Sequence, residues 1–267
     1  MSTRGLRPGI HEALREVGLV ATRSVRRTLR QPALIVPSIV FPLVLLAVTS
    51  SGLNAATRLK GFPTDSYVDF ALTVCFMQGA LFAAITAGSE LATDIESGFL
   101  DRLQLTPLRP MAVLVGQMAG AAALALMATL VYIGAGAIAG VDFRSGPGGV
   151  AVLVVLAMVV SMGMAGVGAL MAARTGQAEA VQGLFPLLFV TLFLSSANFP
   201  RNLMPVTWFR DIATYNPVSY LVEGMRSLII EGWDRTALLK GFGFGLLIMA
   251  VAFVAAARGL QTRMART

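Results

Sequence analysis

Six long apolar segments run through this 267-residue chain. About 20 mostly apolar residues are enough for an α-helix to cross the hydrocarbon core of a bilayer. Segments this long and apolar fold as helices, because the backbone finds no water to bond inside a membrane. The sequence therefore predicts an all-α, polytopic membrane protein with six transmembrane helices. They are expected at residues 32–53, 67–89, 111–139, 149–172, 181–199 and 237–257.

The composition agrees with this class. Hydrophobic residues make up 56% of the chain and charged residues 13%, with a mean hydropathy of +0.74, whereas soluble domains carry roughly 25% charged residues. Cys75 is the single cysteine, so no disulfide can form within the chain. We interpret it as a packing residue.

The basic residues predict how the chain is oriented. Six spans place both termini on one side, and an N-terminus inside puts thirteen of the 21 basic residues in the inner segments. Cytoplasmic segments usually carry the excess of Lys and Arg. We therefore expect a multi-pass protein of the cell (inner) membrane with both termini cytoplasmic. The expected parts are a cytoplasmic N-terminus over 1–31, a transmembrane domain over 32–257 and a basic tail over 258–267.

The N-terminal segment 10–31 has the pattern of an amphipathic helix. At 100° per residue its apolar side chains gather on one arc and its arginines on the opposite arc. Such a helix can lie in the anionic inner interface of the membrane. The alternative is a basic flank that only sets topology. The apolar arc holds Ile10, Leu14, Val17, Ala21, Val25 and Leu29.

Small residues and prolines shape the expected spans. Gly116 and Gly120, and likewise Gly136 and Gly140, stand four residues apart, a spacing that lets neighbouring helices approach closely. The fourth span continues the pattern with Ser161, Ala165, Ala169 and Ala173. Each proline inside a span removes one backbone donor and favours a bend. These prolines are Pro37, Pro42 and Pro186.

The residue types that are missing exclude several functions. The span interiors lack the ionisable groups that gradient-driven carriers and pumps usually place near the midplane. A GxxxxGK[ST] phosphate loop is absent, and with one histidine and one cysteine no catalytic or metal-ligating set can be assembled. We predict no enzyme activity and no cofactor bound by this chain. Energy for any uphill transport must come from another subunit.

A charged stretch interrupts the apolar segments between the second and third expected spans. Asp94 and Glu96 precede Gly98, and apolar residues then alternate with Asp101, Arg102 and Gln104 before Pro107. The pattern predicts a short amphipathic cytoplasmic helix, acidic near its N-terminus, with Phe99 and Leu103 on its apolar edge. Such a helix can insert into a groove on a soluble partner.

Residues 90–117 resemble the corresponding loop of type-2 ABC exporter permeases. That loop has an acidic-x-E-x-G-x-[LV]-[ED]-R-L-x-x-[TS]-P pattern, and the G-F-x-D-R-L form is similar to the drug-exporter branch of daunorubicin-resistance permeases. The resemblance implies that loop 90–110 is a coupling helix that docks into an ABC ATPase. The implied coupling residues are Glu90, Asp94, Glu96, Gly98, Phe99, Asp101, Arg102, Leu103 and Arg109.

A second segment, 198–235, is too interrupted by prolines to span and too apolar to be a free loop. Asn216 as a cap and Pro217 at the first helical position predict a helix start, and apolar residues follow at helical spacing. One interpretation is an interfacial helix anchored by an aromatic belt. The belt residues would be Trp208, Tyr215, Tyr220 and Trp233.

The same family has an F-F-P…P-x-W start and an N-P-[VL]-[ST]-Y-x-V-E-x-[ML]-R finish, both similar to this segment. The resemblance implies an outer re-entrant helix pair that closes the pathway. Glu223 and Arg226 could pair on the helix surface or face the exit route. The implied gate residues are Phe199, Pro200, Trp208, Asn216, Pro217, Tyr220, Glu223 and Arg226.

Together these features indicate the permease subunit of an ATP-driven ABC exporter for an amphipathic or hydrophobic cargo such as a drug, lipid or glycolipid. The resemblance implies a dimer with a second permease, identical or similar, beside two ABC ATPase subunits that bind ATP and Mg. Membrane lipids are expected partners, and nucleic acid is not. The alternatives are a non-transporting scaffold or sensor that recruits an ATPase and, less favoured, a small secondary carrier.

Overall fold

The computed structural model describes residues 10–98 and 110–264. Every regular element in these ranges is helical, as the sequence predicts. The elements are α1 (Ile10–Leu29), α2 (Pro32–Leu53), η1 (Asn54–Arg58), α3 (Tyr67–Glu96), α5 (Pro110–Ile138), α6 (Gly146–Thr175), α7 (Ala178–Gln182), α8 (Leu184–Phe193), η2 (Arg201–Leu203), α9 (Thr207–Tyr215), α10 (Pro217–Ile230) and α11 (Arg235–Met264).

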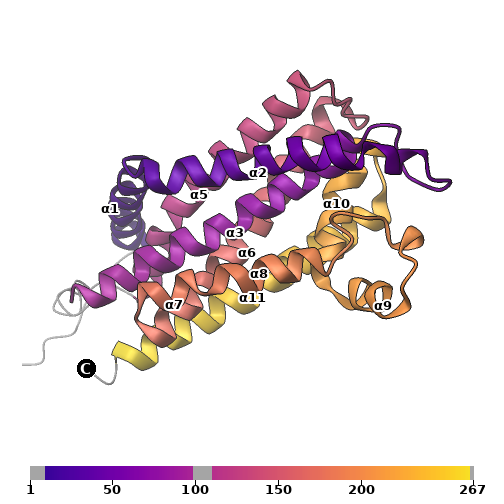
Figure 1. Cartoon of the computed structure of the whole chain (residues 1–267). Helices are drawn as coiled ribbons and strands as arrows, with labels where there is room; N and C mark the ends of the chain where they lie inside the picture. The colour runs from indigo at the N-terminus through magenta and orange to yellow at the C-terminus, as the bar shows by residue number, and fades with distance from the viewer. Residues whose placement is uncertain (1–9, 99–109, 265–267) are drawn as a thin grey trace, which may run out of the picture.

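Five helices in the described part of the chain are long and apolar enough to cross a membrane. They are α2, α3, α5, α6 and α11, and they pack side by side in one elongated bundle (Figure 1). Their bounds agree with the expected spans to within a few residues at most ends. The largest differences are at the C-terminal ends of α3 and α11, which continue past the expected ends at residues 89 and 257 to Glu96 and Met264. The first residues of the expected coupling helix are therefore the last turn of α3.

The structure corrects the expectation of one continuous span over 181–199. The apolar helical stretch covers only Ala178–Phe193, and it divides at Gly183 into α7 and α8. Pro186 has no N–H to donate to the carbonyl of Gln182, so it fits only in the first turn of a new helix. Glycine at 183 further weakens the helix at this point. The residues after Phe193 form turns rather than helix.

Helix α3 is the centre of the bundle. In its most apolar window 89% of the residues are buried, compared with 11% for α2 and 17% for α11. Helices α2, α5, α6, α8 and α10 all pack against α3. The exposed helices α2 and α11 present apolar side chains outward, which suits a lipid environment.

Glycines allow the backbones of α3 and α6 to touch. A Cβ atom added at Gly168 would lie 1.8 Å from the carbonyl oxygen of Ala84, and one added at Gly88 would lie 2.7 Å from the carbonyl oxygen of Gly168. The close approach predicted from small residues is also present elsewhere, since Gly136 of α5 packs against Leu72. Larger side chains at these positions would separate the helices.

A tyrosine completes the hydrogen bonding of α2 at Pro42. Proline leaves the carbonyl of residue i−4, here Ser38, without its helical donor. The buried hydroxyl of Tyr132 on α5 donates to that carbonyl. Gly79 on α3 leaves room for the ring, because a Cβ there would lie 3.0 Å from Cε2 of Tyr132. Three helices are thereby joined at one polar point inside an apolar bundle.

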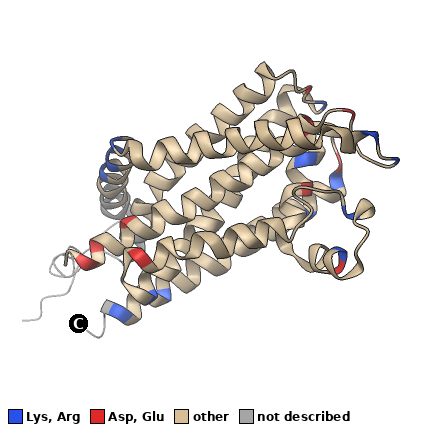
Figure 2. Cartoon of the chain, in the orientation of Figure 1, with Lys and Arg blue, Asp and Glu red and all other residues tan. Residues whose placement is uncertain are grey.

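Charged residues collect at the two ends of the bundle, and its middle is nearly free of them in the view of Figure 2. We call the end with α1 and the last turns of α3, α6 and α11 the α1 end. The opposite end, with η1, η2, α9 and α10, is the α9 end (Figure 1). This separation of charge is the one expected for a protein that lies across a bilayer.

Replacing Gly168 by alanine tests the α3–α6 contact. We expect Gly168→Ala to lower the free energy of unfolding by about 1–3 kcal/mol or more, because overpacking forces the two backbones apart. Gly134→Ala is the matched control, since a Cβ at Gly134 meets nothing within 4 Å and alanine favours the helix. Thermal unfolding of the purified proteins in detergent measures both. A Gly168→Ala protein as stable as the parent would contradict the described packing.

Candidate functional site

A buried polar cluster joins three helices at the α1 end. It consists of Arg23, Ser24, Arg27 and Thr28 of α1, Glu90 and Asp94 of α3, and Gln117 of α5, and we call it the α1–α3 cluster. Residues four apart lie on one face of a helix, so Ser24 and Thr28 both reach Glu90, and Arg23 and Arg27 both reach Asp94. Both carboxylate residues are only 4% exposed.

Glu90 is held by hydroxyl groups of α1. Its Oε2 lies 2.9 Å from Oγ of Ser24, and its Oε1 accepts a hydrogen bond of 2.6 Å from Oγ1 of Thr28. The Ser24 hydroxyl in turn accepts from the backbone N–H of Gly120 at 3.1 Å. A Cβ at Gly120 would lie 2.4 Å from both hydroxyl oxygens. The glycine spacing seen in the sequence therefore makes room for polar side chains of α1.

Asp94 pairs with two arginines and an amide. Nη1 of Arg27 lies 3.0 Å and Nη2 of Arg23 lies 3.2 Å from Oδ1, and Nε2 of Gln117 donates to Oδ2 at 2.6 Å. The arginine side chains are 27% and 45% exposed, respectively, against 6% for Asp94. Solvent screens the arginines in part, so burial makes Asp94 the group that depends most on its partners.

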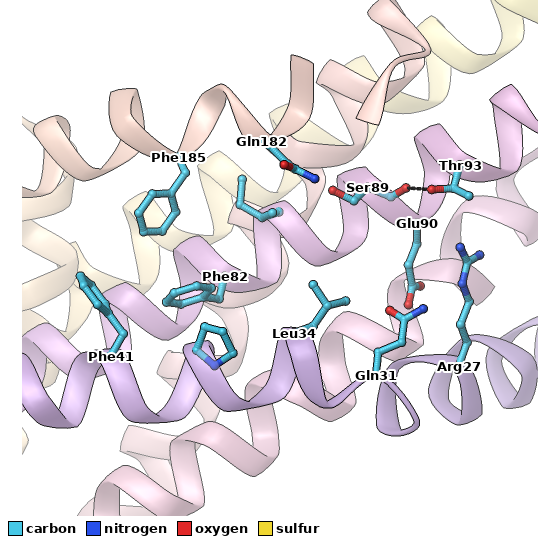
Figure 3. A pocket seen from close by; sticks show the side chains of 12 residues that line it. Arg27, Gln31, Leu34, Phe41, Phe82, Ser89, Glu90, Thr93, Gln182 and Phe185 are labelled. Atoms are coloured by element: carbon cyan, nitrogen blue, oxygen red, sulfur yellow. Dashed lines mark hydrogen bonds between the residues drawn. The ribbon is translucent and has the colours of Figure 1, made fainter. Parts of the chain in front are cut away.

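An elongated pocket of about 560 Å³ lies beside this cluster, between α2, α3 and the α7–α8 pair. Figure 3 shows polar groups at one end, including Arg27, Gln31, Glu90 and Thr93, and aromatic rings at the other. The rings are those of Phe41, Phe82 and Phe185. A pocket with this division suits an amphipathic molecule.

At the α9 end, Asn216 and Pro217 begin α10 as predicted. Oδ1 of Asn216 accepts from the N–H of Val218 at 2.9 Å, which caps the helix. The amide nitrogen of Asn216 donates to the carbonyls of Thr191 and Leu194 at 2.8 and 3.0 Å. These carbonyls end α8 and have no helical donor. One side chain therefore fastens the start of α10 to the end of α8.

Arg226 of α10 is buried, with 7% exposure. Its guanidinium donates to the carbonyls of Phe70, Ser196 and Ala197 at 3.2, 2.9 and 2.6 Å, and it lies 3.5 Å from the centroid of the Phe70 ring. Burial lowers the pKa of Arg226 to about 9, so the group stays charged at neutral pH. This cation ties α10 to α3 and to the turns after α8.

Glu223 does not pair with Arg226, which corrects one of the two expectations for this pair. Glu223 instead forms an ion pair with Arg201 of η2, and it accepts a hydrogen bond of 2.9 Å from Oγ of Ser196. The ring of Tyr220 stacks on Phe244 with centroids 4.9 Å apart, and Arg201 lies 5.0 Å from its centroid. The α9 end is thus closed by contacts between η2, α10 and α11.

The remaining expected gate residues lie in the same region with different exposure. Pro200 is buried and Phe199 is half-buried, with its ring 6.3 Å from that of Phe62. Trp208 is exposed, as are Tyr215 and Trp233. Three of the four expected belt aromatics are therefore on the surface, whereas Tyr220 packs inward.

The family comparison covers both ends of the molecule. A model of the ABC-2 type transporter family matches residues 15–230, from α1 to the end of α10. The chain belongs to the ABC-2 type transporter family. It is accordingly a multi-pass membrane permease of an ABC transporter, and membership implies partnership with an ABC ATPase subunit.

Named relatives of this permease agree with that assignment. It is 25% identical over 233 residues to a probable doxorubicin resistance ABC transporter permease, DrrC, of Mycobacterium tuberculosis, covering 84% of this chain and 82% of the relative. It is 28% identical over 240 residues to the putative transport permease ycf38 of Pyropia yezoensis, covering 88% and 81%. A ycf38 protein of Porphyra purpurea is 28% identical over 233 residues, covering 85% and 78%.

The structure divides the expected coupling residues of the permease. Glu90 and Asp94 face α1 and α5 in the α1–α3 cluster. Glu96 is exposed, and its Oε1 accepts from the backbone N–H of Ala178 at the start of α7 at 2.9 Å. Gly98 has a φ of 64° at the end of α3. Five further coupling residues lie outside the described ranges: Phe99, Asp101, Arg102, Leu103 and Arg109.

Sequence reasoning placed α1 correctly as a helix but missed its buried face. Thr28 and Ser24 are buried, whereas Leu19 and Leu29 of α1 are at least half exposed. The side that packs on α5 carries Val20, Ser24 and Thr28 opposite Gly116 and Gly120. The sequence signal for this buried face was a four-residue spacing that recurs in three helices, at Ser24 and Thr28, Glu90 and Asp94, and Gly116 and Gly120. Within the described residues no group of His, Cys, Asp and Glu is arranged to hold a metal ion.

Removing the carboxylate of Asp94 tests the α1–α3 cluster. We expect Asp94→Ala to lower the free energy of unfolding by about 1–3 kcal/mol, because Gln117 loses a buried partner and two arginines lose their counter-charge. Tryptic cleavage at the α1 arginines should become faster as α1 detaches from α3. Asp211→Ala, at an exposed position on α9, is the control. Unchanged cleavage of α1 would contradict the assigned role.

Replacing Arg226 tests the α9 end. Arg226→Gln should lower the free energy of unfolding by at least about 2 kcal/mol, because buried hydrogen bonds from a charged donor are lost. Arg226→Lys should recover less than half of that loss, since a single ammonium cannot reproduce the planar fork that reaches three carbonyls. Arg210→Gln, exposed on α9, is the control. Thermal unfolding in detergent decides between these outcomes, and full recovery by lysine would show that only the charge matters.

Proposed function

We propose that this chain is the membrane subunit of an ATP-driven exporter for an amphipathic cargo. It works as a dimer with a second permease, identical or similar, beside two ABC ATPase subunits that bind ATP and Mg. The α1 end is cytoplasmic in this proposal, so both termini lie inside. The observation that carries the proposal is helix α3, which links the two ends of the molecule through buried charged contacts.

Helix α3 offers a continuous mechanical connection. Its 30 residues extend over about 45 Å at 1.5 Å per residue. At one end Glu90 and Asp94 bind α1 and α5, and at the other the carbonyl of Phe70 and the hydroxyl of Thr73 accept from Arg226. An ATPase that moves residues 99–109 would pull on the last turn of α3. The displacement would reach α10 and the outer contacts, opening the gate.

The expected outer hairpin is also retained in the proposal. Helices α9 and α10 are short, with 9 and 14 residues, and neither is long enough to span a bilayer. They begin and end at the α9 end of the bundle (Figure 1). This arrangement supports a re-entrant pair over 198–235 that closes the pathway on the outer side. The α7–α8 segment would form the sixth, broken passage through the membrane.

The pocket between α2, α3 and α8 supports the choice of cargo. Its aromatic end suits an apolar ring or chain, and its polar end carries the charges of Arg27 and Glu90. Two curated relatives have doxorubicin resistance in their names, which supports a drug-like molecule. A lipid or glycolipid has the same division into polar and apolar parts.

The exposed faces beside the pocket suit a second permease. On α2, Val44 and Val48 are more than half exposed, and on α8 the same holds for Leu187 and Val190. These residues flank the pocket-lining Phe41 and Phe185 along the chain. A neighbouring copy packed against α2 and α8 would close the pocket from the side. One copy provides half of a sealed pathway in this proposal.

Transport in vesicles with the co-expressed ATPase tests the function. We expect ATP-dependent uptake of a fluorescent amphipathic drug into inside-out vesicles. Leu103→Asp should reduce co-purification of the ATPase at least tenfold, because a charge on the apolar edge of the loop disfavours insertion into a groove. Phe82→Ala should leave ATPase binding intact and lower uptake severalfold. Leu247→Ala, exposed on α11, should change neither.

Other outcomes favour the other candidates. If the ATPase binds but ATP drives no movement of drug or labelled lipid, the chain is a scaffold or sensor. Uptake that needs an ion gradient but no ATPase would indicate a secondary carrier. A Leu103→Asp protein that binds the ATPase normally would remove the proposed docking site.

A further inference from the structure

A second pocket, of about 660 Å³, lies between the ends of α6 and α11 at the α1 end. Its polar lining is basic, with Arg174 from α6 and Arg258, Thr262 and Arg263 from α11. It lies apart from the α2–α3–α8 pocket and shares none of its lining residues. Among the described residues that line it there is no carboxylate.

Two glycines determine the shape of this basic pocket. A Cβ at Gly259 would lie 3.3 Å from Cβ of Ala173, so α6 and α11 meet closely at its floor. Gly176 ends α6 with a φ of 68°, and a Cβ there would lie 2.2 Å from Nη2 of Arg263. Without that Cβ the guanidinium of Arg263 can fold over the end of α6, where Nη1 is 3.5 Å from the carbonyl of Ala173.

The positive charge of the pocket is not neutralised by the described part of the chain. The ion pairs described there involve Arg23, Arg27 and Arg201. Neither Arg174 nor Arg258 is in an ion pair with a described carboxylate, and both side chains are exposed. Within the residues that the structure describes, Arg263 donates to the carbonyl of Ala173 and pairs with no carboxylate. A ligand with negative charge would provide the missing counter-charge.

The outer face of α11 indicates where such a ligand comes from. Leu247, Val251 and Val254 are each at least half exposed. Residues spaced by three and four lie on one face of a helix, so this apolar stripe continues directly into Arg258 and Thr262. An acyl chain lying along the stripe would bring its phosphate to the arginines. A soluble anion or an acidic protein surface has no acyl chain that could pack along the apolar stripe.

We propose that the basic pocket binds the head group of an anionic phospholipid from the leaflet at the α1 end. Arg174 and Arg258 contact the phosphate region, and Arg263 supplies further positive charge from its position over the end of α6. Basic pockets between helix ends on the cytoplasmic side are suited to anionic lipid head groups. The inference concerns a lipid bound to α6 and α11 and does not depend on which cargo is transported.

Native mass spectrometry of the full-length permease in detergent tests this site. We expect phosphatidylglycerol to bind more tightly than phosphatidylcholine. Arg174→Gln and Arg258→Gln should each lower the affinity for phosphatidylglycerol about fivefold. This corresponds to the loss of about 1 kcal/mol for each basic residue near an anionic surface. The effects should be roughly additive in the double variant. Arg258→Lys should retain most of the binding, since it keeps the charge.

Arg235→Gln is the matched control, because it removes an exposed arginine from the opposite end of the same helix. It should leave phosphatidylglycerol binding unchanged. Equal binding of the two lipids, or equal loss in Arg235→Gln and Arg258→Gln, would overturn the proposal. Displacement of phosphatidylglycerol by millimolar inorganic phosphate would assign the pocket to a free anion instead. If the double variant kept its phosphatidylglycerol but no longer co-purified with the ATPase, the pocket would be a contact for the ATPase instead.

Discussion

The structure depends on the requirement that buried charges have partners. Glu90, Asp94 and Arg226 are all nearly inaccessible to solvent, and an unpaired charge in such a position costs several kcal/mol. Each is therefore surrounded by donors or acceptors from other helices. The carboxylates hold α1 and α5 against the last turns of α3, and the guanidinium holds α10 and the turns after α8 against its first turns. Helices that are too polar or too short to span are fixed in place by these contacts.

The polar contacts act at the ends of α3, and close packing acts along its length. Gly88 and Gly168 bring the backbones of α3 and α6 into contact, where a single methyl group would not fit. Interiors packed this closely have low compressibility and transmit displacement. In the proposed exporter, α3 and α6 would therefore move together when the ATPase acts on residues 99–109. Helices α2 and α11 are less buried within this chain and would change position more readily than α3 and α6.

The part of the fold that follows from hydropathy could be predicted, and the part that follows from pairing between distant segments could not. Length and apolarity gave α2, α5 and α6 nearly to their ends and α11 except for its last two turns, and the Asn216-Pro217 pair correctly marked the start of α10. The buried face of α1 was missed because Ser24 and Thr28 are favourable only opposite Glu90, 62 or more residues away. Glu223 and Arg226 showed the same limit. Their helical spacing allowed a pair, but Arg201 binds Glu223 and backbone carbonyls bind Arg226 instead.

The α1–α3 cluster and the pocket between α2, α3 and the α7–α8 pair share two residues, which connects the two halves of the proposed mechanism. Arg27 binds Asp94 and Glu90 binds Thr28, yet both side chains also line the polar end of the pocket. An anionic or cationic head group placed there would compete with, or reinforce, the contacts that hold α1 against α3. Conversely, any movement of α1 relative to α3 would change the charge presented to the pocket. In the proposed exporter, binding of cargo and movement of the α1 end of α3 would therefore be linked through the same charges, and by reciprocity each would bias the other.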